Sequence, residues 1–385
     1  VMTRKELNEI KSQYTLEDCG ILRLCGCYVD GDKNKKSMMR EAFLSLPQDE
    51  MHKYMAIFRK CMTGTLGRNI LNMEFADAAT EVTVSQQKLM DLRDSELKDD
   101  AVLETFYDEI IANYNTADNY LILLVYGVYD VPGRTSDGIE MEDASDEIYR
   151  HILCCICPVK LSKPGLSYNS EQNGFHERIR DWVVDMPAMG FLYPAFNERS
   201  ADVNSILYYS SKAEELKFDF VETVLGCTLP MTAGGQKETF QAIIQDTLGD
   251  ECEFEVVKEI HEQLTELIEE KKDDETPLEL GRKEVVNLLA ASGVDNRKIE
   301  ELENNFEEAA GGSMTQPLLA SNVASTRKFE IKTPDVVVQV KPDRTDLVET
   351  RMIDNVPYLL ITLSDSVQVN GIDVRMPGSK EQEEE

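Results

Sequence analysis

Four short apolar runs in the first half of the chain constrain its fold more than any other feature. They are residues 119–131, 151–161, 190–197 and 205–210, and the first, NYLILLVYGVYDV, is the most apolar and aromatic-rich run. Short runs rich in β-branched and aromatic residues are typical of strands that are buried in a sheet. We therefore expect these four segments to be the buried strands of one sheet, with helices covering it.

The segments that flank these runs carry helix signals. Thr3 can cap a short helix that ends near Tyr14, and residues 99–114 place their apolar side chains on one side. Residues 20–29 read as a further strand, closed by the turn pair Asp30-Gly31. The same periodicity predicts further helices over 50–62, 85–97 and 213–225. Residues 175–184 fit a helix and a strand equally well.

The second half of the chain changes in character. Four amphipathic helices are predicted over 236–248, 252–272, 283–291 and 296–309. Between Asp250 and Glu308 there are 20 acidic and seven basic residues, which is typical of a solvated outer face. After a Gly/Ser/Thr-rich connector, short alternating segments from 328 to 374 predict strands joined by hairpin turns.

These patterns predict an α+β protein in three parts. The first, residues 1–226, is a mixed α/β sheet domain. Residues 227–312 form an acidic helical region, and residues 313–385 form a small β-rich unit that ends in an acidic tail. The 385 residues suffice for two or three domains of ordinary size.

Net charge and cysteine content limit the compartment in which the protein can work and the kinds of partner it can bind. With 72 acidic against 40 basic residues the net charge is −32, which opposes broad adhesion to phosphate backbones or anionic membranes. Nine cysteines without an apolar leader at the N-terminus indicate a reducing compartment, and no apolar run reaches the ~20 residues of a membrane helix. We expect a soluble cytoplasmic protein with no membrane partner and mostly free thiols.

No known cofactor motif stands out. Cys154 and Cys157 have C-x-x-C spacing, and with Cys25, Cys27 and a nearby histidine they could hold zinc. However, the motif lies in an apolar strand, where residues three apart point to opposite faces, so core thiols are the favoured interpretation. Phosphate-binding and dinucleotide-binding glycine patterns are absent. The sequence predicts no cofactor.

The acidic segment after the first apolar run is the one candidate for a catalytic site. Residues 132–146 predict a long surface loop, and carboxylates at Asp137, Glu140 and Asp143 could hold magnesium. This alternative is a metal-dependent hydrolase or nuclease that uses the loop from Asp130 to Asp143. A solvated acidic loop explains the same residues in so acidic a chain.

A nucleic-acid interface is possible only where the chain is locally neutral, between residues 327 and 375. Basic side chains interleave there with an aromatic one, Phe329, although ordinary strand solvation explains them too. The candidate binding residues are Arg327, Lys328, Lys332, Lys341 and Arg344, with Arg351 on the same unit.

Several motifs carry a resemblance to known proteins. They are CGCY at 25–28, TGTLG at 63–67, YDVPG at 129–133, ICPV at 156–159, RDWV at 180–183 and TRKFE at 326–330. On these motifs the chain resembles, over nearly its whole length, an uncharacterised bacterial domain-of-unknown-function family from Gram-positive anaerobes. That resemblance implies no activity.

The second half resembles a further family. A lysine-containing helix, QKETFQA at 236–242, precedes a long acidic helix, and a terminal β unit opens with RKFEI at 327–331. This order is similar to the nucleoid-associated proteins of the NdpA/YejK type, which implies a non-enzymatic binding protein with DNA or a nucleoid protein as its partner. A third interpretation is a scaffold whose acidic helices bind a basic protein.

Overall fold

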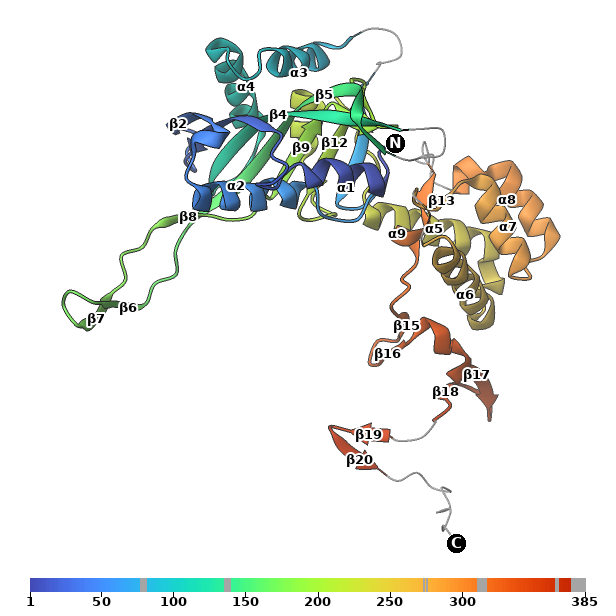
Figure 1. The fold of residues 1–385 in the computed structure, drawn as a ribbon. Coiled ribbons are helices and arrows are strands. Elements are labelled where there is room, and N and C mark those ends of the chain that lie inside the picture. Colours follow the sequence, from blue (N-terminus) through green and yellow to red (C-terminus); the bar gives the residue numbers. More distant parts are fainter. Residues whose placement is uncertain are drawn as a thin grey trace. The chain divides into compact units, whose positions relative to one another are not determined.

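A computed structural model shows the chain as two compact units, Val1–Gly234 and Gly235–Glu385 (Figure 1). The structure describes residues 1–76, 82–134, 140–272, 274, 276–309, 317–363 and 367–374, with side chains except at 134, 140–146 and 307–309. Helices and strands are both abundant, so the α+β prediction is confirmed. The division into three parts with boundaries at 226 and 312 stays a prediction.

Unit 1 is built on one antiparallel sheet with the spatial order β2-β1-β4-β5-β9-β12-β3, and β8 pairs with the end of β5. The four predicted apolar runs supply β4, β5, β9 and β12, which are consecutive in this order, so that prediction is confirmed. The strands are β1 (Ile21–Val29), β2 (Lys35–Ala42), β3 (Ile70–Glu74), β4 (Asn119–Arg134), β5 (Glu140–Leu161), β8 (Trp182–Val184), β9 (Met189–Tyr193) and β12 (Ser205–Ser210).

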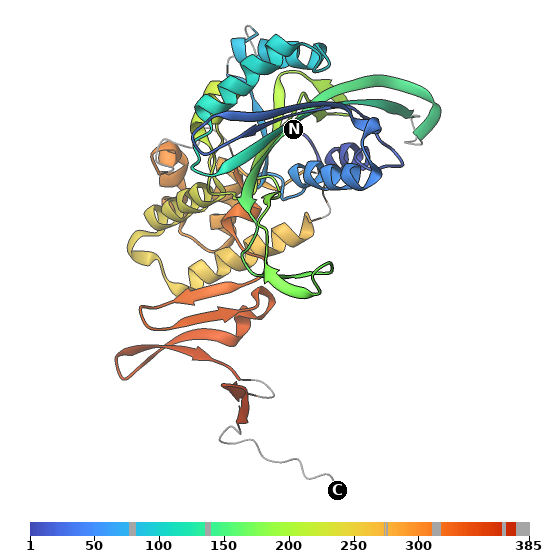
Figure 2. The same ribbon diagram turned by 90° about the vertical axis from the view of Figure 1, so that its left-hand side faces the viewer.

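Helices cover both faces of this sheet (Figures 1 and 2). One face packs under α3 (Val84–Asp94), α4 (Asp100–Asn113) and the π-helix η2 (Phe220–Leu225). The other packs under α1 (Arg4–Ser12) and α2 (Gln48–Cys61). Side chains of a strand alternate between faces, so Ile122 and Leu124 enter the first core while Leu123 and Val125 enter the second. Double burial explains why β4 reads as a continuous apolar run.

Polar caps fix where the covering helices begin. Thr3 accepts a hydrogen bond from the backbone of Glu6, whose carboxylate accepts one from the Thr3 backbone N–H, which completes a capping box. Thr83 and Gln86 form the same box before α3, and Asp99 caps α4. The prediction that Thr3 is an N-cap is therefore confirmed.

Two element predictions in unit 1 are wrong. The expected loop over 132–146 is largely a β-ribbon, because β4 continues to Arg134 and β5 begins at Glu140; residues 135–139 lie outside the described residues. Pairing of two long neighbouring strands outweighs the low strand propensity of the acidic residues. The expected helix over 213–225 is not helical at 213–217, and it ends as predicted at Gly226, which has a positive φ of 66°.

The segment between β5 and β9 leaves the sheet as a projecting arm, which we define as residues 162–186 (Figure 1). It contains the ribbon β6 (Leu166–Asn169) and β7 (Gly174–Glu177), and β8 returns the chain to the edge of the sheet. A second small hairpin, β10 (Ala195–Asn197) and β11 (Ser200–Asp202), follows β9. The segment 175–184, which fits helix and strand equally well in sequence, is therefore extended.

Unit 2 opens with the four predicted helices, whose existence is confirmed. Their apolar side chains, among them Ile243, Leu264 and Leu289, are buried. A two-stranded bridge and a short helix follow them. The elements are α5 (Ala233–Leu248), η3 (Gly249–Glu251), α6 (Phe254–Glu270), β13 (Glu279–Leu280), α7 (Arg282–Ala291), α8 (Asn296–Ala309), β14 (Leu318–Leu319) and α9 (Ala320–Val323).

The predicted C-terminal strands are present, and they pair as three separate two-stranded ribbons. They are β15 (Phe329–Lys332) with β16 (Val337–Val340), β17 (Val348–Ile353) with β18 (Val356–Ile361), and β19 (Val367–Val369) with β20 (Ile372–Val374); the 3-10 helix η4 (Pro342–Leu347) joins the first two ribbons. Throughout the described residues, every helix is too short or too polar to span a membrane.

Candidate interaction surfaces

The predicted basic residues lie around the first two C-terminal ribbons, but they do not form a purely positive surface. Lys328 Nζ lies 2.7 Å from the carboxylate of Glu330, and Arg344 Nε lies 3.2 Å from that of Asp346. Arg351 pairs in the same way with Glu349 at 2.8 Å. The remaining candidates, Arg327, Lys332 and Lys341, are exposed.

These exposed ion pairs contribute little to stability, yet they decide the charge of the surface. Hydrogen bonds from Lys328 and Gln339 hold the pKa of Glu330 below its ordinary value, so its carboxylate is ionised near neutral pH. Residues 317–363 hold six basic and six acidic side chains. Direct phosphate binding by this region would therefore have to proceed without a net positive charge.

The same ribbons expose apolar side chains that an isolated domain would bury. Two-stranded ribbons without a third strand or a covering helix are marginal in water, and here the buried Phe329 and Val348 anchor only the starts of β15 and β17. The exposed side chains are Val336, Val337, Met352, Ile353, Val356, Tyr358, Ile361, Leu363, Val369 and Ile372. A surface of this kind is typical of a contact region for another protein.

A groove of about 680 Å³ lies between α6 and η4. Five carboxylates and a single cation line it: Glu262, Glu266, Glu269, Asp343, Asp346 and Arg344. The two walls are held together by the buried Thr345, whose hydroxyl donates to Glu262, and by Lys258, whose ammonium donates to the carbonyl of Val348. The groove is therefore a built, strongly acidic concavity beside the exposed apolar ribbons.

Aromatic packing holds the start of β15 against α6. Phe329, at the start of β15, is buried against the rings of Phe254 and His261 on α6, with ring centroids 6.3 and 5.1 Å apart. Burial lowers the pKa of His261, so the ring is neutral near pH 7. The aromatic residue that the sequence suggested for nucleic-acid stacking is therefore used inside unit 2.

The structure does not test the carboxylate site proposed for the enzyme alternative. Asp137 lies outside the described residues, and the side chains of Glu140 and Asp143 do as well. Within the part of the chain that is described, no three His, Cys, Asp or Glu side chains converge as a metal site would require. The hydrolase or nuclease interpretation stays a prediction.

Seven of the nine cysteines are buried in the core, while Cys19 is half-buried and Cys252 is exposed. Cys154 points into the core under α3 and α4, whereas Cys155 and Cys157 point into the core under α1 and α2, so the C-x-x-C pair lies on opposite faces as expected. Burial raises the pKa of both Cys25 and Cys27 to about 11, which keeps these thiols protonated. Among the described residues, these thiols do not form a group of three or more ligands that could hold a metal ion.

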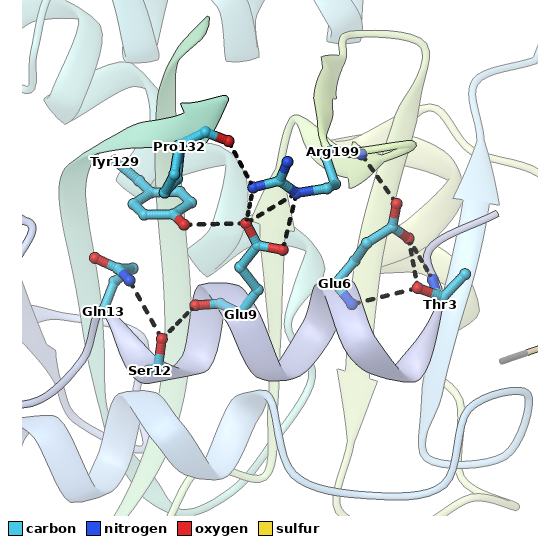
Figure 3. Close-up of polar contacts among 8 residues, drawn as sticks. All are labelled: Thr3, Glu6, Glu9, Ser12, Gln13, Tyr129, Pro132 and Arg199. Atoms are coloured by element: carbon cyan, nitrogen blue, oxygen red, sulfur yellow. Dashed lines mark hydrogen bonds and ion pairs between the residues drawn. The ribbon is translucent and has the colours of Figure 1, made fainter. Parts of the chain in front are cut away.

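A polar cluster ties α1 to the turn between β10 and β11 (Figure 3). Arg199 donates to the Glu9 carboxylate from Nε and Nη2 and to the carbonyl of Pro132, at 2.9–3.2 Å. Tyr129 also donates to Glu9, at 3.0 Å. Glu198 and Arg199 both have positive φ, 53° and 57°, which is costly for residues other than glycine. The ion pair holds this turn, so we interpret the cluster as structural.

Replacing Arg199 with alanine should lower the free energy of unfolding by about 2 kcal/mol. The pair is only about 15% exposed, and the change leaves the Glu9 carboxylate without its cation. Urea unfolding measures the effect, and Lys212→Ala, which removes the fully solvated pair with Glu215, is the matched control with a change under ~0.5 kcal/mol. Equal losses in both variants would contradict this role.

The arm is the feature that the sequence did not reveal. Residues directly opposite each other on its ribbon are Leu166 with Glu177, Ser167 with His176, and Tyr168 with Phe175. One face therefore carries Leu166, Tyr168 and Phe175 together with Glu177, while the other carries Ser167 and His176. The available signal was this alternation on both sides of the polar turn at 170–173, but its four-residue strands are too short to distinguish from a loop.

The fold and these surfaces together define an α+β protein with an acidic groove and exposed apolar ribbons. Comparison with known families is more specific: the family model described as Domain of unknown function (DUF4317) matches residues 2–372, and the chain belongs to this family. The resemblance to an uncharacterised family is thereby confirmed, and the nucleoid-associated resemblance stays a prediction. Searches of the curated proteins and of the solved structures gave no match.

Proposed function

We propose that this chain is a non-enzymatic binding protein whose partner is a basic, partly apolar segment of another protein. The single observation that carries the proposal is the acidic groove between α6 and η4, with exposed apolar ribbons beside it. A strand with lysine or arginine on one side and aliphatic residues on the other would complement both parts. Complementary charge would also accelerate the encounter.

The charge distribution favours a protein partner over DNA. The chain carries −32 overall, and the ribbons that hold the predicted nucleic-acid residues are locally neutral. Binding to a duplex depends on several phosphates that each meet an unpaired cation, whereas Lys328, Arg344 and Arg351 each have a carboxylate within 3.2 Å. A cationic peptide meets no such obstacle in the groove.

The test measures binding of a fluorescein-labelled peptide of alternating lysine and leucine by anisotropy at low salt. We expect Glu262→Gln/Glu266→Gln/Glu269→Gln to weaken binding about tenfold or more, because each carboxylate in contact with a cation contributes roughly 0.5–1 kcal/mol. Added salt should reduce the wild-type affinity. Glu255→Gln/Glu259→Gln/Glu270→Gln is the matched control, since it removes the same charge from α6 outside the groove.

Two outcomes would contradict the proposal. One is equal binding by the groove variant and its control, which would show attraction to net charge alone. The other is binding of a short duplex DNA that is lost in Lys328→Glu/Lys332→Glu, which would support the nucleoid interpretation instead. A peptide with glutamate in place of lysine serves as the negative probe.

A further inference from the structure

The arm of unit 1 exposes more large apolar side chains than a free surface ribbon would. Figure 1 shows it leaving the sheet as a long two-stranded extension. Its exposed apolar side chains are Leu166, Tyr168, Phe175, Ile179, Trp182, Val183, Val184 and Met186. Within the described residues, β6 and β7 pair only with each other, so this ribbon has no third strand to stabilise it.

The geometry points to a second copy of this chain as the occupant: we propose that two arms pack through their apolar faces to form a dimer. Tyr168 and Phe175 are directly opposite across the ribbon, with ring centroids 5.6 Å apart and ring planes tilted by 60°, and they form one aromatic patch. In a two-fold arrangement the patch of one copy covers the patch of the other, because an isologous interface is self-complementary.

The exposed area is sufficient for such an interface. An aromatic side chain buries 150–250 Å², so Tyr168, Phe175 and Trp182, at 56%, 70% and 56% exposure, offer roughly 350 Å². The five exposed aliphatic side chains, which are between 38% and 85% exposed, add roughly 180–360 Å² together, from transfer energies scaled by that exposure. The total is roughly 530–710 Å² per partner, which reaches the ~600 Å² per partner at the lower end of stable interfaces.

The charge of the arm also favours a second copy of this chain as its partner. Residues 162–186 contain three basic and four acidic side chains, a net charge of −1 in a chain of −32. Two copies would repel through most of their surfaces, and the arm is where this repulsion is nearly absent. The same near neutrality gives the arm no attraction for phosphate backbones or anionic lipids. Both signs are present, so charges of one arm can meet opposite charges of the other.

The experiment uses the full chain and sedimentation over a concentration series. The wild type should sediment as a dimer, and Tyr168→Glu/Phe175→Glu should weaken dimerisation at least ~100-fold, because two central aromatic anchors are lost. Ser167→Glu/His176→Glu is the matched control, since it places the same charges on the opposite face of the same two strands. The control should remain a dimer.

The single tryptophan of the chain, Trp182, provides an independent readout. It lies at the root of the arm and is 56% exposed in one copy. Its emission should shift to the red on dilution of the wild type, and should be red at all concentrations in Tyr168→Glu/Phe175→Glu. Far-ultraviolet circular dichroism should match the wild type, and so should urea unfolding at concentrations where the wild type is dissociated, because both positions lie outside the core.

Several outcomes would overturn the proposal. A wild type that stays monomeric at all concentrations would do so, as would a dimer that both double variants weaken equally. A monomer whose Trp182 emission responds to anionic vesicles or to the lysine–leucine peptide would assign the arm to a membrane or to another protein. None of these results bears on the groove of unit 2, so the two proposals can fail separately.

Discussion

Replacing Gly190 with alanine should lower the free energy of unfolding by about 3 kcal/mol, because the added methyl group overpacks the sheet. Gly190 lies in β9, paired with β5 on one side and β12 on the other. A Cβ atom there would lie 2.4 Å from the carbonyl oxygen of Cys154 and 2.6 Å from the Sγ of Cys61. The carbonyl belongs to the backbone of the central strand, so it cannot move without breaking the sheet.

Urea unfolding measures this prediction, and Gly165→Ala is its control. A Cβ at Gly165 meets nothing within 4 Å, so that variant should change stability by less than ~1 kcal/mol in either direction. Adding Cys61→Ala to Gly190→Ala removes the sulfur contact but not the carbonyl contact, so it should restore only part of the loss. Tolerance of Gly190→Ala within ~0.5 kcal/mol would show that β9 packs more loosely than described.

The second large effect is an acid sensitivity that depends on His151. Its ring is fully buried, stacked on Tyr149 at 4.7 Å, and its Nε2 shares a hydrogen bond of 2.8 Å with the hydroxyl of Tyr14. Gly127, its partner on β4, makes room for the ring, because a Cβ there would lie 2.6 Å from Nε2. Burial lowers the pKa of His151 to about 3.

The direction of the effect follows from which state binds the proton. Below about pH 6.5, the ordinary pKa of histidine, His151 is protonated in the unfolded chain but stays neutral in the folded protein. Stability is therefore fully present above pH 6.5 and falls as the pH drops toward 3, by about 1.4 kcal/mol per unit. The loss should reach about 2 kcal/mol between pH 6.5 and pH 5, above the isoelectric point of about 4.5.

Urea unfolding at several pH values, compared between wild type and His151→Gln, isolates the contribution of His151 protonation to the free energy of unfolding. The variant should lose less stability than the wild type over the same pH range, whatever its stability at pH 7. His176→Gln removes an exposed histidine and should keep the wild-type slope. Parallel curves for wild type and His151→Gln would rule out His151 as the source.

The central sheet was predictable because its signal is local. Each of β4, β5, β9 and β12 is a short run buried on both faces, and burial on both faces makes apolarity continuous in sequence. The cap at Thr3 and the amphipathic acidic helices were predictable for the same reason. In each case the residues that determine the element lie within one or two turns of each other.

The failures share a different cause, which is pairing between distant segments. Residues 140–146 are acidic and read as a loop, yet they extend β5 because β4 continues beside them. The turn at Glu198 and Arg199 has no glycine or asparagine to indicate positive φ, and its anchor, Glu9, lies 190 positions away. The arm and the groove likewise depend on which side chains remain uncovered after folding, and sequence periodicity does not report this.

Because consecutive cysteines are buried on opposite faces of the sheet, their thiols can report separately on the opening of the two helical layers. Cys154 is enclosed by one set of helices and Cys155, its neighbour in sequence, by the other. Each thiol is inaccessible until the helices that cover it detach from the sheet. Maleimide labelling in mild denaturant, followed by mass spectrometry of the peptides, would therefore measure how fast each thiol becomes exposed. Simultaneous labelling would show that the domain opens as one cooperative body, and staggered labelling would show which layer detaches first.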